Sequence, residues 1–182
     1  MNITNCYIKC KWSFKRKYPI EYIVVHYPGN TAPAVNQCKY YSRTSQIKSA
    51  HFVVDSSGEI YQCLPVIDGA YHVVSKKGAT NNNSIGIDMC CEKLDLLSKK
   101  STDDDWYHTE SCMIAAAGLI RFLMREYGIP IYHVLRHYDV TGKICPASMC
   151  GQKINRYYGV SGDEAWIRFK QMICGGRCGS QN

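Results

Sequence analysis

The sequence contains no long hydrophobic run. No stretch of about 18 consecutive apolar residues, the length that marks a membrane-spanning helix, occurs in its 182 residues. The first 20 residues also lack the apolar segment and small-residue cleavage site of a secretory signal peptide. We therefore expect a protein that does not insert into a membrane and that is synthesised in the cytoplasm.

Internal repeats and linkers rich in proline, glycine or serine are also absent. The hydrophobic content of 46% and the charged content of 20% are typical of a globular protein. A chain of this length most simply forms one domain. We expect an N-terminal extension over residues 1–19, a single domain over 20–173, a flexible tail over 174–182, and a monomer.

The lysines and arginines form no stripe, although the net charge is +7. Nucleic-acid-binding proteins usually gather their basic residues on one face or along a recognition helix. We therefore expect no nucleic-acid partner. A mildly basic surface suits a polyanion such as bacterial cell wall, and it is equally consistent with ordinary solubility.

Eleven cysteines are many for this length. Without a signal peptide the compartment of synthesis is reducing, which argues against a framework of disulfides. Four cysteines lie within apolar runs and are expected to be small core residues: Cys63, Cys90, Cys91 and Cys112. The pairs "CYIKC" (6–10) and "CGGRC" (174–178) lie near the termini; a second zinc site of four thiolates is conceivable there, but free thiols are the preferred interpretation.

Strand and helix patterns alternate along the chain, which predicts an α/β fold with a central mixed β-sheet flanked by helices. The segment 93–107 is polar and charged, and we expect a surface loop there. Strands are predicted in 21–30, 85–90 and 131–140, a hairpin in 49–65, and helices in 32–48, 109–128 and 161–173.

His26, His137 and Cys145 are the candidate metal ligands. The pattern places each histidine at a strand end, and the turn-like "DVTGKI" is expected to bring Cys145 back toward His137. Catalytic zinc sites use three such protein ligands and leave a fourth position open. Two alternatives remain: Cys145 is the nucleophile of a cysteine hydrolase, or the histidines are ordinary surface or core residues.

Five motifs occur in one order: "YIVVHYPGN", "SAHFVVD…GEIYQCLP", "GAYHV", "NNNSIGIDMC" and "RHYDVTGKICP". Together they resemble the zinc-dependent N-acetylmuramoyl-L-alanine amidases of the type-two amidase family. That family includes phage endolysins and shares its fold with the peptidoglycan recognition proteins. The similarity extends over about residues 20–173.

The resemblance implies that His26, His137 and Cys145 hold Zn²⁺ and that Lys143 stabilises the oxyanion. Asp88 stands where the family usually has a catalytic glutamate, and its side chain is shorter by one C–C bond, about 1.5 Å. Glu92 lies nearby in sequence and would replace that glutamate only if the strand bends.

For the substrate groove the resemblance points to Tyr71, His72 and His51. The alternative for His72 and His51 is that each is a hydrogen-bonded structural histidine. Asn30 either contacts substrate or closes the turn after Gly29. The implied activity is hydrolysis of the amide between N-acetylmuramic acid and L-alanine in bacterial peptidoglycan. The implied source is a phage or prophage endolysin that acts on the cell wall after release. A recognition protein that binds peptidoglycan without cleaving it is the alternative.

Overall fold

The computed structural model describes residues 2–6 and 12–175, and within them the central element is a mixed sheet of six strands. The strand order is β1-β5-β4-β7-β3-β10. Strands β4, β7, β3 and β10 run parallel, and β5 is antiparallel to β4 as the predicted hairpin requires. The strands are β1 (Ile3–Asn5), β3 (Tyr22–His26), β4 (Phe52–Val54), β5 (Ile60–Gln62), β7 (Ser84–Met89) and β10 (Val134–Arg136). The predicted α/β class is confirmed.

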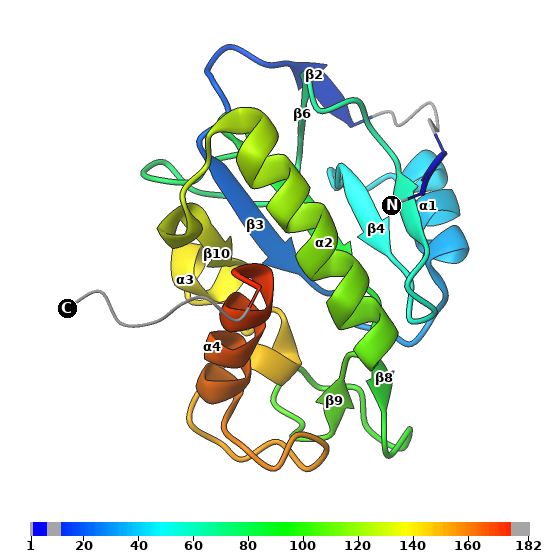
Figure 1. Cartoon of the computed structure of the whole chain (residues 1–182). Coiled ribbons are helices and arrows are strands. Elements are labelled where there is room, and N and C mark those ends of the chain that lie inside the picture. The colour runs from blue at the N-terminus through cyan, green and yellow to red at the C-terminus, as the bar shows by residue number, and fades with distance from the viewer. Residues whose placement is uncertain (1, 7–11, 176–182) are drawn as a thin grey trace, which may run out of the picture.

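Helices α2 (Glu110–Tyr127) and α4 (Gly162–Ile173) pack on one face of this sheet (Figure 1). Both begin where the sequence predicts, because the hydroxyls of Thr109 and Ser161 accept hydrogen bonds from the backbone three residues on. Gly128 ends α2 at φ 66°, a conformation that favours glycine. The largest hydrophobic cluster lies between these helices and the sheet.

Helix α1 (Ala34–Arg43) covers part of the opposite face. Its buried side consists of Ala34, Gln37, Cys38 and Tyr41, which follow a helical spacing. This helix ends earlier than the predicted 32–48. The four cysteines expected in the core are free and buried, so that expectation is confirmed.

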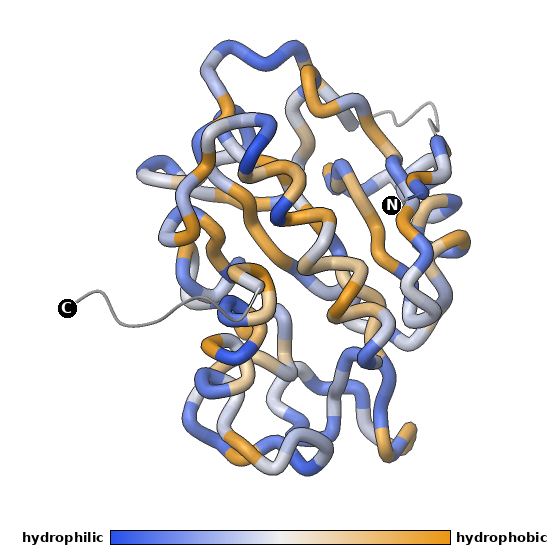
Figure 2. The backbone as a smooth tube through the Cα atoms, viewed as in Figure 1, coloured by the Kyte–Doolittle hydropathy of each residue, from blue (hydrophilic) through white to orange (hydrophobic). Residues whose placement is uncertain are grey.

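Strands β3 and β7 alternate between the two faces of the sheet. Ile23 and Val25 of β3 belong to the cluster beneath α2, so Val24 and His26 point the other way. The same alternation sends Asp88 of β7 to the face that bears His26, and these two residues are register partners. The strongly hydrophobic course of β3 and β4 is visible in Figure 2. A polar site is thus placed at the carboxyl ends of parallel strands, a common position for ligand sites in α/β folds.

Two predicted elements are wrong in detail. The ends of segment 93–107 form a ribbon, β8 (Glu92–Lys93) with β9 (Trp106–Tyr107), and the side chains of Lys93 and Trp106 are buried. Lys93 is compensated by Asp103 at 2.9 Å and by Asp105. This compensation permits a lysine to be buried, which local polarity does not reveal.

The predicted strand 131–140 is also shorter. Only β10 is extended, and His137 is the first residue of helix α3 (His137–Thr141) rather than a strand end. The Asp139 carboxylate accepts a hydrogen bond from the Arg136 backbone N–H at 2.8 Å, which caps this helix. This cap depends on contacts of Arg136 with distant segments, namely Asp163 and the carbonyl of Met149, so the local sequence pattern does not predict it.

The N-terminal segment adds strands on both sides of residues 7–11. β1 pairs with β5, and β2 (Ser13–Lys15) pairs with β6 (Asp68–Ala70). Cys174 is disulfide-bonded, so the expectation of a free thiol there is wrong. Cys10, Cys178 and most of the tail predicted over 174–182 lie outside the described residues. Among the described helices, none is long and apolar enough to cross a membrane.

Candidate metal centre

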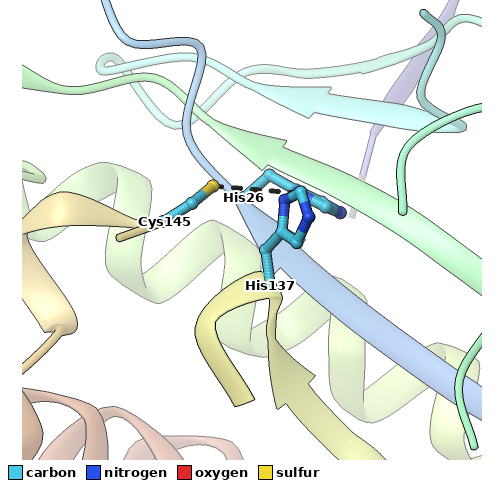
Figure 3. Close-up of side chains that lie close together, drawn as sticks. All are labelled: His26, His137 and Cys145. Carbon is cyan, nitrogen blue, oxygen red and sulfur yellow. Dashed lines mark hydrogen bonds between the residues drawn. The ribbon is translucent and has the colours of Figure 1, made fainter. Parts of the chain in front are cut away.

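His26, His137 and Cys145 converge at the carboxyl end of β3 (Figure 3). The Nδ1 atoms of the two histidines are 3.1 Å apart, and Sγ of Cys145 is 3.8 Å from Nδ1 of His26. All three side chains are buried. The segment after α3 folds back as predicted, since the backbone N–H of Tyr138 donates to the carbonyl of Cys145 at 3.0 Å.

These separations fit the edges of a zinc coordination tetrahedron. Zinc–nitrogen bonds of about 2.05 Å and a zinc–sulfur bond of about 2.3 Å give N···N and N···S edges of about 3.3 and 3.6 Å. The observed values are 3.1 and 3.8 Å. Two imidazoles and a thiolate also form a donor set that zinc prefers. The three residues therefore fit a zinc ion.

A chain of hydrogen bonds sets the tautomer of His26. The hydroxyl of Ser84 donates to the carbonyl of Thr80, so its oxygen accepts from Nε2–H of His72 at 3.1 Å. Nδ1 of His72 is then an acceptor for Nε2–H of His26 at 3.0 Å. This leaves a lone pair on Nδ1 of His26, directed at His137 and Cys145, as a metal ligand requires.

Gly86 makes room for this chain. A Cβ atom at that position would lie 2.5 Å from Cγ of the His72 ring. His72 lines the cavity above the site, but both of its ring nitrogens are bonded within the protein. We therefore assign it the positioning of His26 rather than a polar contact with substrate.

The surroundings of His26 and His137 favour neutral imidazoles, the form that binds a metal ion. Burial lowers the pKa of His26 well below its usual range and that of His137 to about 4. Burial also raises the pKa of the Cys145 thiol to about 12. A nucleophilic cysteine needs a lowered pKa, so this environment argues against a cysteine hydrolase. A bound cation would instead stabilise the thiolate.

Asp88 lies next to His26 and receives a hydrogen bond from the hydroxyl of Tyr41 on α1. Burial raises the pKa of the Asp88 carboxyl to about 6, while the Tyr41 hydroxyl and the nearby Lys143 oppose this shift. A carboxyl with a pKa near neutrality is suited to accept and return a proton. Glu92 lies on β8, in a separate ribbon, and does not line the cavity.

A cavity of about 460 Å³ opens above these groups. Lys143 and Tyr71 both line this cavity, so each lies where it could act in the role expected of it. Asn30 lines it too, and its side-chain oxygen accepts from the backbone N–H of Ala32 at 2.9 Å, so Asn30 also closes the turn.

His51 is placed differently from the prediction. Its side chain is fully buried, with Nδ1 accepting from the backbone N–H of Gly86 at 3.0 Å. Nε2 therefore carries the proton and donates to the carbonyl of Asp68 at 3.0 Å. Because both nitrogens are used inside the core, the expectation that His51 contacts substrate is wrong.

Arg136 holds together the segments that carry two of the candidate metal ligands, His137 and Cys145. Its guanidinium contacts Asp139 of α3 at 2.7 Å, Asp163 of α4 at 2.6 Å and the carbonyl of Met149 at 2.5 Å. His137 follows it directly, and Met149 ends the 3₁₀ turn Ala147–Met149 that follows Cys145. The positions of these two candidate ligands thus depend on one buried cation.

Replacing Arg136 with methionine is expected to lower the free energy of unfolding by about 3–5 kcal/mol, because it leaves two partly buried carboxylates without their cation. Urea unfolding followed by circular dichroism measures the change. The control is Arg168→Met, which removes an exposed pair with Glu164 and should cost less than about 1 kcal/mol. Equal losses in the two variants would contradict the role given to Arg136.

Tyr41 and Lys48 are cavity residues that the sequence analysis does not identify. The sequence does contain a clue to Tyr41. It continues the buried helical spacing of α1, and a buried tyrosine hydroxyl usually has a hydrogen-bond partner. Lys48 has no such signal, because it lies in an exposed segment after α1. Its place in the wall of the same cavity as Asp88 follows from tertiary structure.

The sequence matches the family model described as N-acetylmuramoyl-L-alanine amidase over residues 16–148. It is 36% identical over 141 residues to the amidase CwlL of Bacillus licheniformis, covering 69% of this chain and 35% of CwlL. It is 31% identical over 163 residues to the amidase XlyA of Bacillus subtilis (strain 168), covering 88% of this chain and 46% of XlyA. The chain thus spans less than half the length of these two relatives.

The fold is similar to that of solved catalytic domains. The PlyG catalytic domain aligns with a TM-score of 0.74 and 25% identity, covering 100% of this chain and 99% of that domain. The catalytic domain of XlyA aligns with a TM-score of 0.69 and 28% identity, covering 95% and 99% of the two chains. The part of each protein that this chain resembles is the catalytic part.

Proposed function

The chain belongs to the N-acetylmuramoyl-L-alanine amidase family, and on that premise we propose that it hydrolyses the amide bond between N-acetylmuramic acid and L-alanine in bacterial peptidoglycan. The observation that carries the proposal is the convergence of His26, His137 and Cys145 beside a buried carboxyl and an open cavity. One solved structure that this chain resembles, at 28% identity and a TM-score of 0.68, is named as an endolysin from Bacillus subtilis, which supports action on the cell wall as a phage or prophage lysin.

We assign Zn²⁺ to His26, His137 and Cys145. A zinc ion held there would lower the pKa of a water molecule toward about 7 and would polarise a carbonyl oxygen. Asp88 accepts the proton of the attacking water and returns it to the leaving amine. Lys143 places its ammonium group beside the negative charge that develops on the carbonyl oxygen. Tyr71 and Asn30 line the cavity where the muramic acid and stem peptide would bind.

Digestion of purified peptidoglycan tests the proposal. New L-alanine amino termini are expected, and treatment of the protein with a chelator should abolish them until Zn²⁺ is restored. New reducing sugar ends would indicate a glycosidase and overturn the proposal. Binding to the wall without new termini would favour the alternative of a recognition protein, for which the aspartate at position 88 is the motivating observation.

Replacing Lys143 with methionine is expected to lower kcat about 10²-fold, since one oxyanion donor contributes roughly 3 kcal/mol to the transition state. KM should change little, because the charge develops only during the reaction. Steady-state rates on a soluble muropeptide measure both constants. Lys99→Met, at an exposed lysine that does not line the cavity, is the control. A loss confined to KM would assign Lys143 to substrate binding instead.

Tyr41→Phe is expected to shift the acidic limb of the pH profile of kcat/KM to higher pH. The Tyr41 hydroxyl stabilises the Asp88 carboxylate, so its removal raises a pKa that already lies at about 6. The base must be deprotonated to act. The variant should therefore lose much of its kcat/KM at pH values below the pKa of Asp88, and little at pH values well above it. Tyr40→Phe alters a hydroxyl that donates to Gln46 instead, and should leave the limb in place. An unshifted limb in Tyr41→Phe would remove Asp88 as the titrating base.

A further inference from the structure

Three cysteines that take no part in the metal centre gather where helix α1 packs on the sheet. Cys38 of α1 and Cys63, directly after β5, are both 1% exposed, and their Sγ atoms are 3.3 Å apart. Cys6, directly after β1, is partly exposed and packs against the same hydrophobic cluster. Helix α1 and the segments directly after β5 and the edge strand β1 therefore each contribute one thiol.

The separation of Cys38 and Cys63 is close to that of a disulfide. A sulfur–sulfur bond is about 2.05 Å long, so a closing movement of about 1.3 Å joins the two sulfurs. The two thiols are hydrogen-bonded to each other, and this bond lowers the pKa of Cys38 while it raises that of Cys63.

We propose that Cys38 and Cys63 form a disulfide when the protein meets a low-molecular-weight disulfide, and that Cys6 is the thiol through which the oxidation enters. Cys6 is accessible, whereas the other two thiols are buried. Cys6 also interacts with Cys38 directly. The inference depends on the fold alone and does not require the proposed amidase activity.

The exchange balances in three steps. The Cys6 thiolate attacks the small disulfide, forms a mixed disulfide and releases one small thiol. Cys38 then attacks the Cys6 sulfur and releases the second small thiol. Cys63 attacks the Cys38 sulfur, and its proton goes to the departing Cys6. Two protein thiols are oxidised to a disulfide, and one small disulfide is reduced to two thiols.

Such a bond would fasten α1 to the sheet. The residue before the helix, Pro33, supplies no side-chain cap, although the Asp55 carboxylate accepts from the backbone N–H of Ala34. The buried side of the helix is made mostly of small or polar residues. It also carries Tyr41, whose hydroxyl donates to Asp88 in the cavity. Oxidation would therefore stabilise the wall of the cavity that holds this hydroxyl, after the protein leaves a reducing compartment.

The test is incubation of the full chain with oxidised glutathione, followed by tryptic peptide mapping without reduction. Trypsin cuts after Lys39, Arg43 and Lys48, so the two cysteines lie in separate peptides. We expect a linked pair of Cys38 and Cys63 peptides that has lost two hydrogen atoms. The melting temperature should rise by roughly 5–10 °C and return on reduction, because the bond closes a loop of 25 residues.

Matched variants separate the thiols. Cys63→Ala and Cys38→Ala should show no rise in melting temperature after incubation with oxidised glutathione. Circular dichroism under reducing conditions shows whether each variant is folded. Cys112→Ala, a buried thiol on α2, should keep both the link and the rise. Cys6→Ser should reach the same product at least 10-fold more slowly. Absence of the Cys38–Cys63 link in folded protein, or a stable link from Cys6 at the end point, would overturn the proposal.

Discussion

Cys145→Ser is expected to lose bound zinc and to lower the rate of peptidoglycan hydrolysis by at least about 10³-fold. Serine keeps the size of the side chain, but its hydroxyl is not deprotonated near neutral pH and is a poor partner for this ion. The fold should survive, because Cys145 adds little volume to the core. Metal analysis of purified protein and release of L-alanine amino termini give the two readouts.

Cys150→Ser is the matched control for this variant. Cys150 is the next cysteine along the chain, and its thiol donates to the carbonyl of Pro146 rather than facing the histidines. It should retain zinc and activity. If Cys145→Ser kept its zinc but lost activity, the sulfur would be a nucleophile and the cysteine hydrolase alternative would return.

Asp88→Asn is expected to lower kcat by about 10²–10⁴-fold with the zinc content unchanged. An amide of the same shape can accept the hydrogen bond from Tyr41, but it cannot take a proton from water. The rate of release of L-alanine termini at pH 8, where Asp88 is deprotonated, measures the loss.

Glu92→Gln is the control for the carboxylate, because Glu92 is close in sequence and lies on a different ribbon. Its activity should equal that of the unaltered protein. Loss of activity in Glu92→Gln with retention in Asp88→Asn would transfer the role of general base from one residue to the other. If both variants retained full activity, a mechanism in which neither carboxyl carries the proton would be favoured.

The sequence predicts those parts of the fold that local physics determines. β3 is a β-branched run closed by a proline–glycine turn, and α2 has a threonine at its start and a glycine at its end. The convergence of His26 with Cys145 is predicted from motif spacing and from resemblance, and the structure brings these side chains together. Their role as ligands remains a proposal.

Other features depend on contacts between distant segments. His137 begins a helix because Arg136 pairs with Asp139 and with Asp163 of α4, and no local pattern reports a partner 27 residues away. His51 is drawn into the core by the backbone of β7 and the carbonyl of Asp68. Tyr41 reaches Asp88 only because α1 packs on the face of the sheet that carries this carboxyl.

The most direct test of the zinc assignment is X-ray absorption at the zinc edge, measured on the full chain supplied with an equal amount of Zn²⁺. We expect a zinc shell with two nitrogen ligands at about 2.0–2.1 Å, one sulfur at about 2.3 Å and one light-atom ligand from solvent. The sulfur should disappear in Cys145→Ser and persist in Cys150→Ser. A zinc shell without sulfur in the unaltered protein, or no zinc retained at all, would contradict the zinc assignment.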